Sequence, residues 1–299
     1  MTESSAGRCW FVPVLELLAK AVSRSPQPLL LAMGVVLGWL SLPLLGRRRA
    51  YARTNLALCF PDMGLRPREQ LLRDNLRATV TGALELLRAW YAPDRRLLGL
   101  ATVQGLEHLR QARAAGRGVL LFGGHFVHSE LAARLLQQLA DVPVHVVVRR
   151  NNHACIESMF DRARCRAFAG TIAKKDVRGL LRTLLQGGVV AYSADQNFTY
   201  QSAFVPFFGV PAATLTATPD IARRGKAVVL PFWFHRDANG HYHLRIEPQW
   251  EGWPSGNPTA DAARYMAELE NVVRAHPEQY LWVHRRFKTR PPGEPRVYP

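Results

Sequence analysis

Short apolar runs alternate with amphipathic segments through the middle of the chain. The apolar runs are rich in valine and leucine and have the length of buried strands; they fall at 118–122, 143–148, 187–194 and 227–234. The segments between them have helical spacing of their apolar residues, near 129–140, 153–167, 176–186 and 214–224. Strands that alternate with helices form βαβ units. The pattern therefore predicts an α/β fold with a mostly parallel central sheet flanked by helices.

The amino-terminal part of the chain has a different pattern. Residues 29–45 contain no charged side chain, and as a helix they would span roughly 26 Å, near the lower limit for crossing a bilayer core. Arg47, Arg48, Arg49 and Arg53 follow directly, which favours a cytoplasmic location for the rest of the chain. A buried core helix and a signal peptide share this composition. We expect a membrane-associated helix, which crosses the membrane or lies in its interface.

These patterns divide the chain into two parts. Residues 1–48 form the predicted membrane anchor, and residues 49–299 form the predicted catalytic domain. Its first portion, 49–100, is a helical lead-in in which leucines recur among charges, as in a helix with one solvated face.

The charge of the chain narrows the choice of partners. The formal net charge is +16, which predicts attraction to nucleic acid, to a phospholipid surface or to an acidic carrier protein. We find no zinc finger, no aromatic RNA-binding signature and no isolated basic tail, so no nucleic-acid partner is expected. A membrane surface and an acidic carrier remain.

The cysteines follow no pattern of a metal site or a disulfide framework. Cys9, Cys59, Cys155 and Cys165 are widely and irregularly spaced. We therefore expect four reduced thiols and a cytoplasmic environment.

The candidate chemistry lies in "GVLLFGGHFVHSE", residues 118–130. An apolar strand ends at Gly123, and His125 falls in the loop that follows, where catalytic groups collect in open parallel sheets. His125 and Glu130 can meet only if His125 precedes the next helix and Glu130 lies in its first turn. The amides of Gly123 and Gly124 could then help to hold an oxyanion. The alternative is a half-exposed histidine near a glutamate that the helix dipole favours.

A metal centre is not expected. His125, His128 and Glu130 look like a cluster of metal ligands, but a further firm ligand is missing from the motif. None of the cysteines occupies a glycine-flanked turn between a strand and a helix, which argues against a cysteine nucleophile. We predict no metal and no cofactor.

Several motifs together resemble one known family. They occur in the expected order over nearly the whole chain: "RTNLALCFPD" (53–62), "GGHFVHSE" (123–130), "VVRRNN" (147–152), "SADQNF" (193–198), "AFVPFFGVPAATLTAT" (203–218) and "PEQYLWVHRRFKTRPPGE" (277–294). This set resembles the late acyltransferases of lipid A biosynthesis, the lauroyl and myristoyl transferases of Gram-negative bacteria. The family's hallmark is a His-x4-acid motif after a short strand.

The resemblance implies a reaction and a set of roles. A fatty acyl group would pass from an acyl carrier protein thioester to a hydroxyl of a phosphorylated glucosamine-based lipid precursor, at the bacterial inner membrane with the catalytic domain on the cytoplasmic side. The implied sheet is like that of glycerolipid acyltransferases. His125 would be the general base, and Glu130 would fix its tautomer. Arg149 would hold a phosphate or the oxyanion, and Asp195 would have a positioning role; their alternatives are a surface ion pair and a strand-end cap.

Two other functions remain open at this point. One is a related acyltransferase that acts on another glycolipid or an aminolipid. The other is a non-catalytic, membrane-tethered protein that binds polyanions. Loss of activity on removal of the His125 imidazole would separate both acyltransferases from the last. The sequence specifies neither the acyl chain length nor the oligomeric state.

Overall fold

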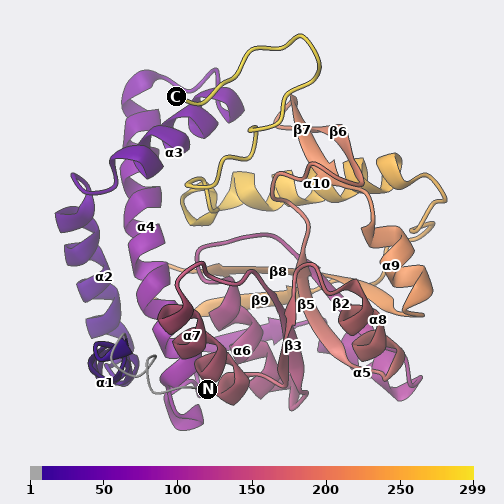
Figure 1. The fold of residues 1–299 in the computed structure, drawn as a ribbon, viewed down its shortest axis with the longest axis horizontal. Coiled ribbons are helices and arrows are strands. Elements are labelled where there is room, and N and C mark those ends of the chain that lie inside the picture. The colour runs from indigo at the N-terminus through magenta and orange to yellow at the C-terminus, as the bar shows by residue number, and fades with distance from the viewer. Residues whose placement is uncertain (1–8) are drawn as a thin grey trace.

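The computed structural model describes residues 9–299 (Figure 1). Its helices are α1 (Val12–Ser23), α2 (Gln27–Ser41), α3 (Gly46–Cys59), α4 (Leu65–Tyr91), α5 (Leu106–Ala114), α6 (Ser129–Ala140), α7 (Ala154–Ala167), α8 (Val177–Leu185), α9 (Thr218–Arg224) and α10 (Pro258–Ala275), with the 3-10 turns η2 (Asp94–Arg96) and η3 (Pro277–Gln279). Its strands are β1 (Ala101–Gln104), β2 (Val119–Gly123), β3 (Val144–Val148), β4 (Gly170–Ala173), β5 (Val189–Ser193), β6 (Ser202–Phe207), β7 (Val210–Leu215), β8 (Val228–Arg236) and β9 (Tyr242–Ile246).

A seven-stranded sheet in the order β1-β9-β8-β2-β5-β3-β4 forms the centre of the molecule. The pairing is parallel at every junction except β8 with β9, which confirms the predicted α/β fold. Strand β2 lies in the middle and is buried along its whole length, since helices cover both faces of the sheet. Val119 of β2 is paired with Val189 of β5 on one side and with Val228 of β8 on the other.

The structure contains strands that the apolar pattern did not predict. Strands β1, β4 and β9 extend the sheet, and β6 pairs with β7 as a separate antiparallel hairpin. The helix predicted near 214–224 therefore begins only at Thr218, because 210–215 belong to β7. Helix α10 covers one side of the sheet, with the hairpin beyond it, and α5 and α6 cover the other side (Figure 1).

Helix α4 runs along one flank of the molecule, with α2 beside it (Figure 1). The predicted helical lead-in is two helices, α3 and α4, and the latter has 27 residues. The helix is amphipathic, as predicted: Leu72 and Leu76 are buried in the core, whereas Arg66 and Gln70 are exposed.

The uncharged stretch 29–45 is not one continuous helix, and its association with a membrane stays a prediction. Helix α2 ends at Ser41, and Pro43, two residues later, has no amide hydrogen to donate to a continuing helix. Among residues 9–299, no single helix has both the length and the apolar composition needed to span a membrane. Helices α2 and α3 meet that test only as a pair, and they are bent by 99° at the break between them.

The expectation of four reduced cysteines is wrong for two of them. A disulfide joins Cys9, just before α1, to Cys155 in α7. Their Cα atoms lie 5.6 Å apart, a separation that the sequence cannot reveal because the two residues are 146 positions apart. Cys59 and Cys165 are free, the first buried and the second exposed.

Candidate active site

His125 lies in the loop between β2 and α6, as predicted. The strand ends at Gly123 and the helix begins at Ser129, so the loop opens at the carboxyl edge of the central parallel strands. A segment near the carboxyl terminus holds this loop in place. Leu281 donates its amide to the carbonyl of His125 at 3.0 Å, and Val127 donates its amide to the carbonyl of Gln279 at 2.9 Å.

Asp195 is the carboxylate that contacts the His125 ring. It follows β5, the strand next to β2, and its Oδ1 lies 2.5 Å from His125 Nδ1. The other oxygen accepts hydrogen bonds at 2.9 Å from the amide of His125 and from the hydroxyl of Tyr280. The Asp195 side chain is fully buried, whereas 34% of the His125 side chain is exposed. Nδ1 of His125 is therefore hydrogen-bonded to a buried carboxylate, while part of the ring remains accessible to a substrate.

The two groups stabilise each other's charged forms. Burial raises the pKa of Asp195, but the charge of His125 and three hydrogen bonds lower it more, so the pKa lies well below its ordinary value. Burial lowers the pKa of His125, but the charge of Asp195 and the hydrogen bond to it raise it more, so the pKa of His125 lies above its ordinary value. A histidine held in this way is a stronger base than a free imidazole.

Glu130 does not contact His125, which corrects the predicted role of its carboxylate. Glu130 does lie in the first turn of α6, which the sequence analysis required for a contact with His125. Its carboxylate accepts hydrogen bonds from Trp90 Nε1 at 2.6 Å and from Arg164, whose Nη2 lies 2.7 Å from Oε1. The Arg164 guanidinium also stacks over the Trp90 ring, 4.7 Å from its centre. Glu130 therefore joins α6 to α4 and α7.

Gly123 and Gly124 are required by close packing. A Cβ atom at Gly123 would lie 2.7 Å from the carbonyl oxygen of Phe232 in β8, and one at Gly124 would lie 2.5 Å from Leu269 in α10. The carbonyl of Gly123 also accepts a hydrogen bond of 2.7 Å from the hydroxyl of Tyr265. These contacts explain the two glycines, and the oxyanion role of their amides stays a prediction.

Arg149 is exposed just beyond β3, and the pKa of Lys174 is lowered by burial first and by the charge of Arg149 second. The arginine that is paired with the motif acid Glu130 is Arg164 of α7, and the sequence analysis did not identify it. Trp90 and Tyr280 were also missed. The quoted segment 277–294 contains Tyr280, but nothing in the spacing of these residues shows that they converge on the loop after β2.

His284, in the same carboxyl-terminal segment, lies near the His125–Asp195 pair. The amide of Asn197, two residues after Asp195, donates to His284 Nε2 at 3.3 Å. Burial and the nearby charge of His125 lower the pKa of His284 to about 4. His284 is therefore neutral at pH 7.

His128 is buried and contacts aromatic rings. Its ring lies 5.4 Å from the centre of Phe234 and 5.5 Å from that of Tyr242. Burial, with the charge of Arg236 next in importance, holds the pKa of His128 well below its ordinary value. In residues 9–299, His, Cys, Asp and Glu side chains form no group of three or more that could hold a metal ion.

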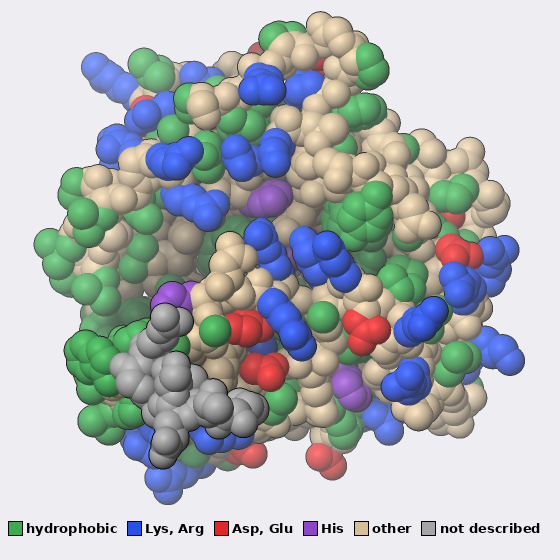
Figure 2. All heavy atoms as spheres, in the orientation of Figure 1, with side chains coloured by type: hydrophobic (Ala, Val, Ile, Leu, Met, Phe, Trp, Pro, Cys, Tyr) green, Lys and Arg blue, Asp and Glu red, His purple; other side chains and the backbone are tan. Residues whose placement is uncertain are grey.

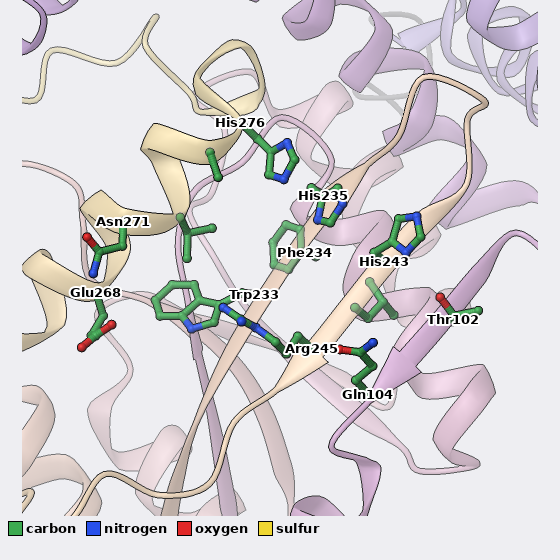
Figure 3. Close-up of a pocket in the computed structure, with 13 residues that line it drawn as sticks. Thr102, Gln104, Trp233, Phe234, His235, His243, Arg245, Glu268, Asn271 and His276 are labelled. Atoms are coloured by element: carbon green, nitrogen blue, oxygen red, sulfur yellow. The ribbon is translucent and has the colours of Figure 1, made fainter.

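A second cluster of histidines lines a cavity of about 390 Å³ between β8, β9 and α10 (Figure 3). His276 stacks on His235 with ring centres 4.0 Å apart, and His235 stacks on His243 at 4.8 Å. Burial and the two neighbouring rings lower the pKa of His235 to about 4. His235, the middle ring of the column, is therefore neutral at pH 7.

Comparisons with known proteins agree with the motifs. Residues 2–289 match the model of the family described as bacterial lipid A biosynthesis acyltransferase. The chain is 36% identical to the lipid A biosynthesis palmitoleoyltransferase of Escherichia coli K12, over 91% of this chain and 89% of that protein. It is also 36% identical to the lipid A biosynthesis lauroyltransferase of the same organism, over 93% and 91% of the two chains. The E. coli myristoyltransferase is 27% identical over 84% of this chain and 78% of that protein.

The family match covers nearly the whole length, and it includes both the loop that carries His125 and the strand end that carries Asp195. The three relatives are named as transferases of three different acyl groups. The chain belongs to the bacterial lipid A biosynthesis acyltransferase family.

Proposed function

We propose that this acyltransferase moves a fatty acyl chain from an acyl carrier protein thioester to a hydroxyl of a phosphorylated lipid A precursor, at the cytoplasmic face of the bacterial inner membrane. The observation that carries the proposal is the His125–Asp195 pair, in which a buried carboxylate holds one ring nitrogen and the histidine remains accessible. Family membership supports lipid A as the product class.

The pair supports a direct transfer. Neutral His125 takes the proton of the acceptor hydroxyl, and the oxygen attacks the thioester carbonyl carbon. Asp195 accepts the Nδ1 hydrogen bond and stabilises the imidazolium that forms. The carbon–sulfur bond then breaks, and the carrier sulfur takes the proton from His125 and leaves as the thiol. Oxygen replaces sulfur on the acyl carbon, and no covalent acyl-enzyme is required.

We assign Glu130 a positioning role in this scheme. Its bonds to Trp90 and Arg164 fix the first turn of α6, which begins only four residues after His125. Gly123 and Gly124 remain proposed donors to the oxyanion, and Arg149 a proposed contact to an acceptor phosphate. The formal charge of +16 supports recognition of an acidic carrier and of phosphates.

The membrane location rests on composition. Acceptor lipids of this class have several acyl chains, and the uncharged stretch 29–45 is followed by four arginines within eight residues. We propose residues 1–48 as the membrane-associated part and 49–299 as the catalytic part.

The test is acyl transfer by the purified protein. It is incubated with acyl carrier protein thioesters of several chain lengths and with a phosphorylated, hydroxyacylated glucosamine disaccharide, and mass spectrometry records which lipid gains an acyl group. We expect His125→Ala to lose about 100-fold or more in rate, since general-base help is worth that much. Equal transfer to a dephosphorylated acceptor, or near wild-type turnover by His125→Ala, would contradict the proposal.

A further inference from the structure

Exposed apolar side chains are concentrated on the two amino-terminal helices. In residues 9–299, twelve of the nineteen large apolar side chains that are exposed lie before residue 45. They are Trp10, Val14, Leu15, Leu17, Leu18, Leu29, Val35, Val36, Leu37, Trp39, Leu40 and Leu44. Figure 2 shows the resulting apolar band on the left edge of the molecule, over α1 and α2, with basic side chains above and below it. We call this band the α1–α2 face.

The opposite side of α2 packs against α4. A Cβ atom at Gly34 would lie 2.9 Å from Cβ of Thr81, and one at Gly38 would lie 3.0 Å from Cα of Arg77. The glycines therefore permit the two helix backbones to approach closely. The contact positions fall along α4 as they rise along α2, so the helices run antiparallel, and α2 is attached to the catalytic part over most of its length.

Charged groups of α4 lie beside both ends of α2. Arg88 is hydrogen-bonded to Gln27 at the start of α2. Near its end, the Arg77 guanidinium lies 4.9 Å from the centre of the Trp39 ring and is paired with Asp74. If α2 crossed the hydrocarbon core in this arrangement, it would carry these charges with it, which is strongly unfavourable. With 15 residues, α2 is also only about 22 Å long, shorter than the core.

The charges around the face suit an anionic surface. Glu16 is the only acid between residues 9 and 59, and it is paired with Arg162 of α7. Basic residues lie at both ends of the α1–α2 face: Lys20, Arg24, Arg47, Arg48 and Arg49. Such side chains bind anionic headgroups while apolar residues enter the boundary of the acyl chains.

We propose that the α1–α2 face binds the interface of an anionic phospholipid membrane while α2 stays packed on α4, so that this protein lies on one leaflet instead of spanning the bilayer. The proposal rests on the membrane location given under the proposed function and specifies how the protein reaches it. It would place the catalytic part directly against the leaflet from which a lipid acceptor must be drawn.

The first test is binding of the full-length protein to phospholipid vesicles. The double variant Val36→Glu, Leu40→Glu puts two charges on the face, and both side chains point outward, with 56% and 67% exposed. We expect its affinity for vesicles with anionic lipid to fall more than tenfold. The matched control is Leu185→Glu in α8, an apolar side chain exposed to a similar extent (56%) away from the face, which should bind like the wild type. Unchanged binding of the double variant would overturn the proposal.

The second test separates lying on the membrane from crossing it. Single cysteines at two exposed positions, Arg24→Cys at the turn between α1 and α2 and Arg178→Cys in α8, are made on a Cys165→Ser background. An impermeant maleimide is added to sealed membrane vesicles. We expect both cysteines to react from the same side. Reaction from opposite sides would show that α2 spans the bilayer.

Transfer to a detergent-dispersed acceptor is measured in parallel. Retained transfer by Val36→Glu, Leu40→Glu, together with lost vesicle binding, supports the proposal. If the wild type binds vesicles through the α1–α2 face but transfers no acyl group, the proposed reaction is wrong and the proposed membrane-binding role of the face is supported. If the double variant changes only the oligomeric state, as measured by analytical ultracentrifugation, the face is a contact between two copies of this chain and the membrane proposal is wrong.

Discussion

The basicity of His125 depends on the acid that is hydrogen-bonded to its ring. The sequence offers two acids, Glu130 five positions away and Asp195 seventy positions away, and the structure places the distant one on Nδ1. The near one is directed to Trp90 and Arg164 on other helices. Distance along the chain is a poor guide here, because the ends of neighbouring parallel strands meet at one edge of the sheet.

Asp195→Asn should change both the rate and the pH dependence of transfer. A general base acts in its neutral form, so activity should rise with pH through the raised pKa of His125. Removing the carboxylate charge lowers that pKa, so the acid limb should move to lower pH, while the plateau rate falls by about 100-fold or more. The control is Asp220→Asn in α9, a half-exposed acid paired with Arg223. An acid limb that does not move would contradict the pairing.

Glu130→Gln tests a positioning role. The amide oxygen can still accept from Trp90, but the ion pair with Arg164 is lost, and we expect the rate to fall about tenfold because small displacements of a catalytic group are costly. The pH profile should stay that of the wild type, since Glu130 does not touch the His125 ring. The matched control is Glu107→Gln, an exposed acid in the first turn of α5. A shifted profile would restore Glu130 as the partner of His125.

At the scale of elements, the pairing of α2 with α4 is specific and depends on small residues. Gln27 of α2 is also within 3.3 Å of the hydroxyl of Tyr242 in β9, so the start of this helix is bonded to the sheet as well. Glu85 of α4 is paired with Arg236 of β8 in the same buried region. Helix α2 is therefore an integral part of the fold and not a detachable anchor.

Gly34→Val should destabilise the fold through this contact. The added side chain would collide with Thr81, and overpacking of this kind costs about 2 kcal/mol in the free energy of unfolding. Adding Thr81→Ala should recover part of the loss, because the two positions are in contact. The control is Gly46→Val in α3, where a Cβ atom would meet nothing within 4 Å. Urea unfolding is measured for the wild type, Gly34→Val, Thr81→Ala, the double variant and Gly46→Val, and additive effects of the first two changes would contradict the contact.

At the scale of the whole molecule, several neutral histidines are distributed through the fold. The pKa lies below its ordinary value at four of them, with burial as the main cause: His128, His235, His276 and His284. The unfolded chain can protonate these groups below about pH 6.5, whereas the folded protein resists protonation. The stability that these four histidines contribute is therefore fully present above that pH and decreases as the pH falls toward 4.

His235→Asn should make the protein less sensitive to acid. Its pKa of about 4 reflects burial and the rings of His276 and His243, opposed by Asp237, and a neutral amide cannot take up the proton. We expect the urea midpoint of the wild type to fall between pH 7 and pH 4.5, and that of the variant to fall less. Equal losses in both proteins would show that the histidine column does not contribute to the pH dependence.

The order of strands and helices around the site was predictable because it depends on the local spacing of apolar residues. Apolar runs of strand length and segments with helical spacing located β2, β3, β5, β8 and the helices between them. The position of His125 after β2 and of Asp195 after β5 followed from the same pattern. Short or amphipathic strands such as β1 and β9 have no comparable signal, because their stability comes from the neighbours with which they pair.

The sequence by itself determined the α/β order, the family, the histidine and the apolar, basic amino terminus. Only the tertiary structure decided which acid binds His125, which arginine binds Glu130, that Cys9 meets Cys155, and that α2 packs on α4. The physical reason is common to all four. Each is a contact between residues that are far apart in the sequence. Such a contact forms only when helices and strands pack together, and a local sequence pattern does not predict which distant residues come into contact.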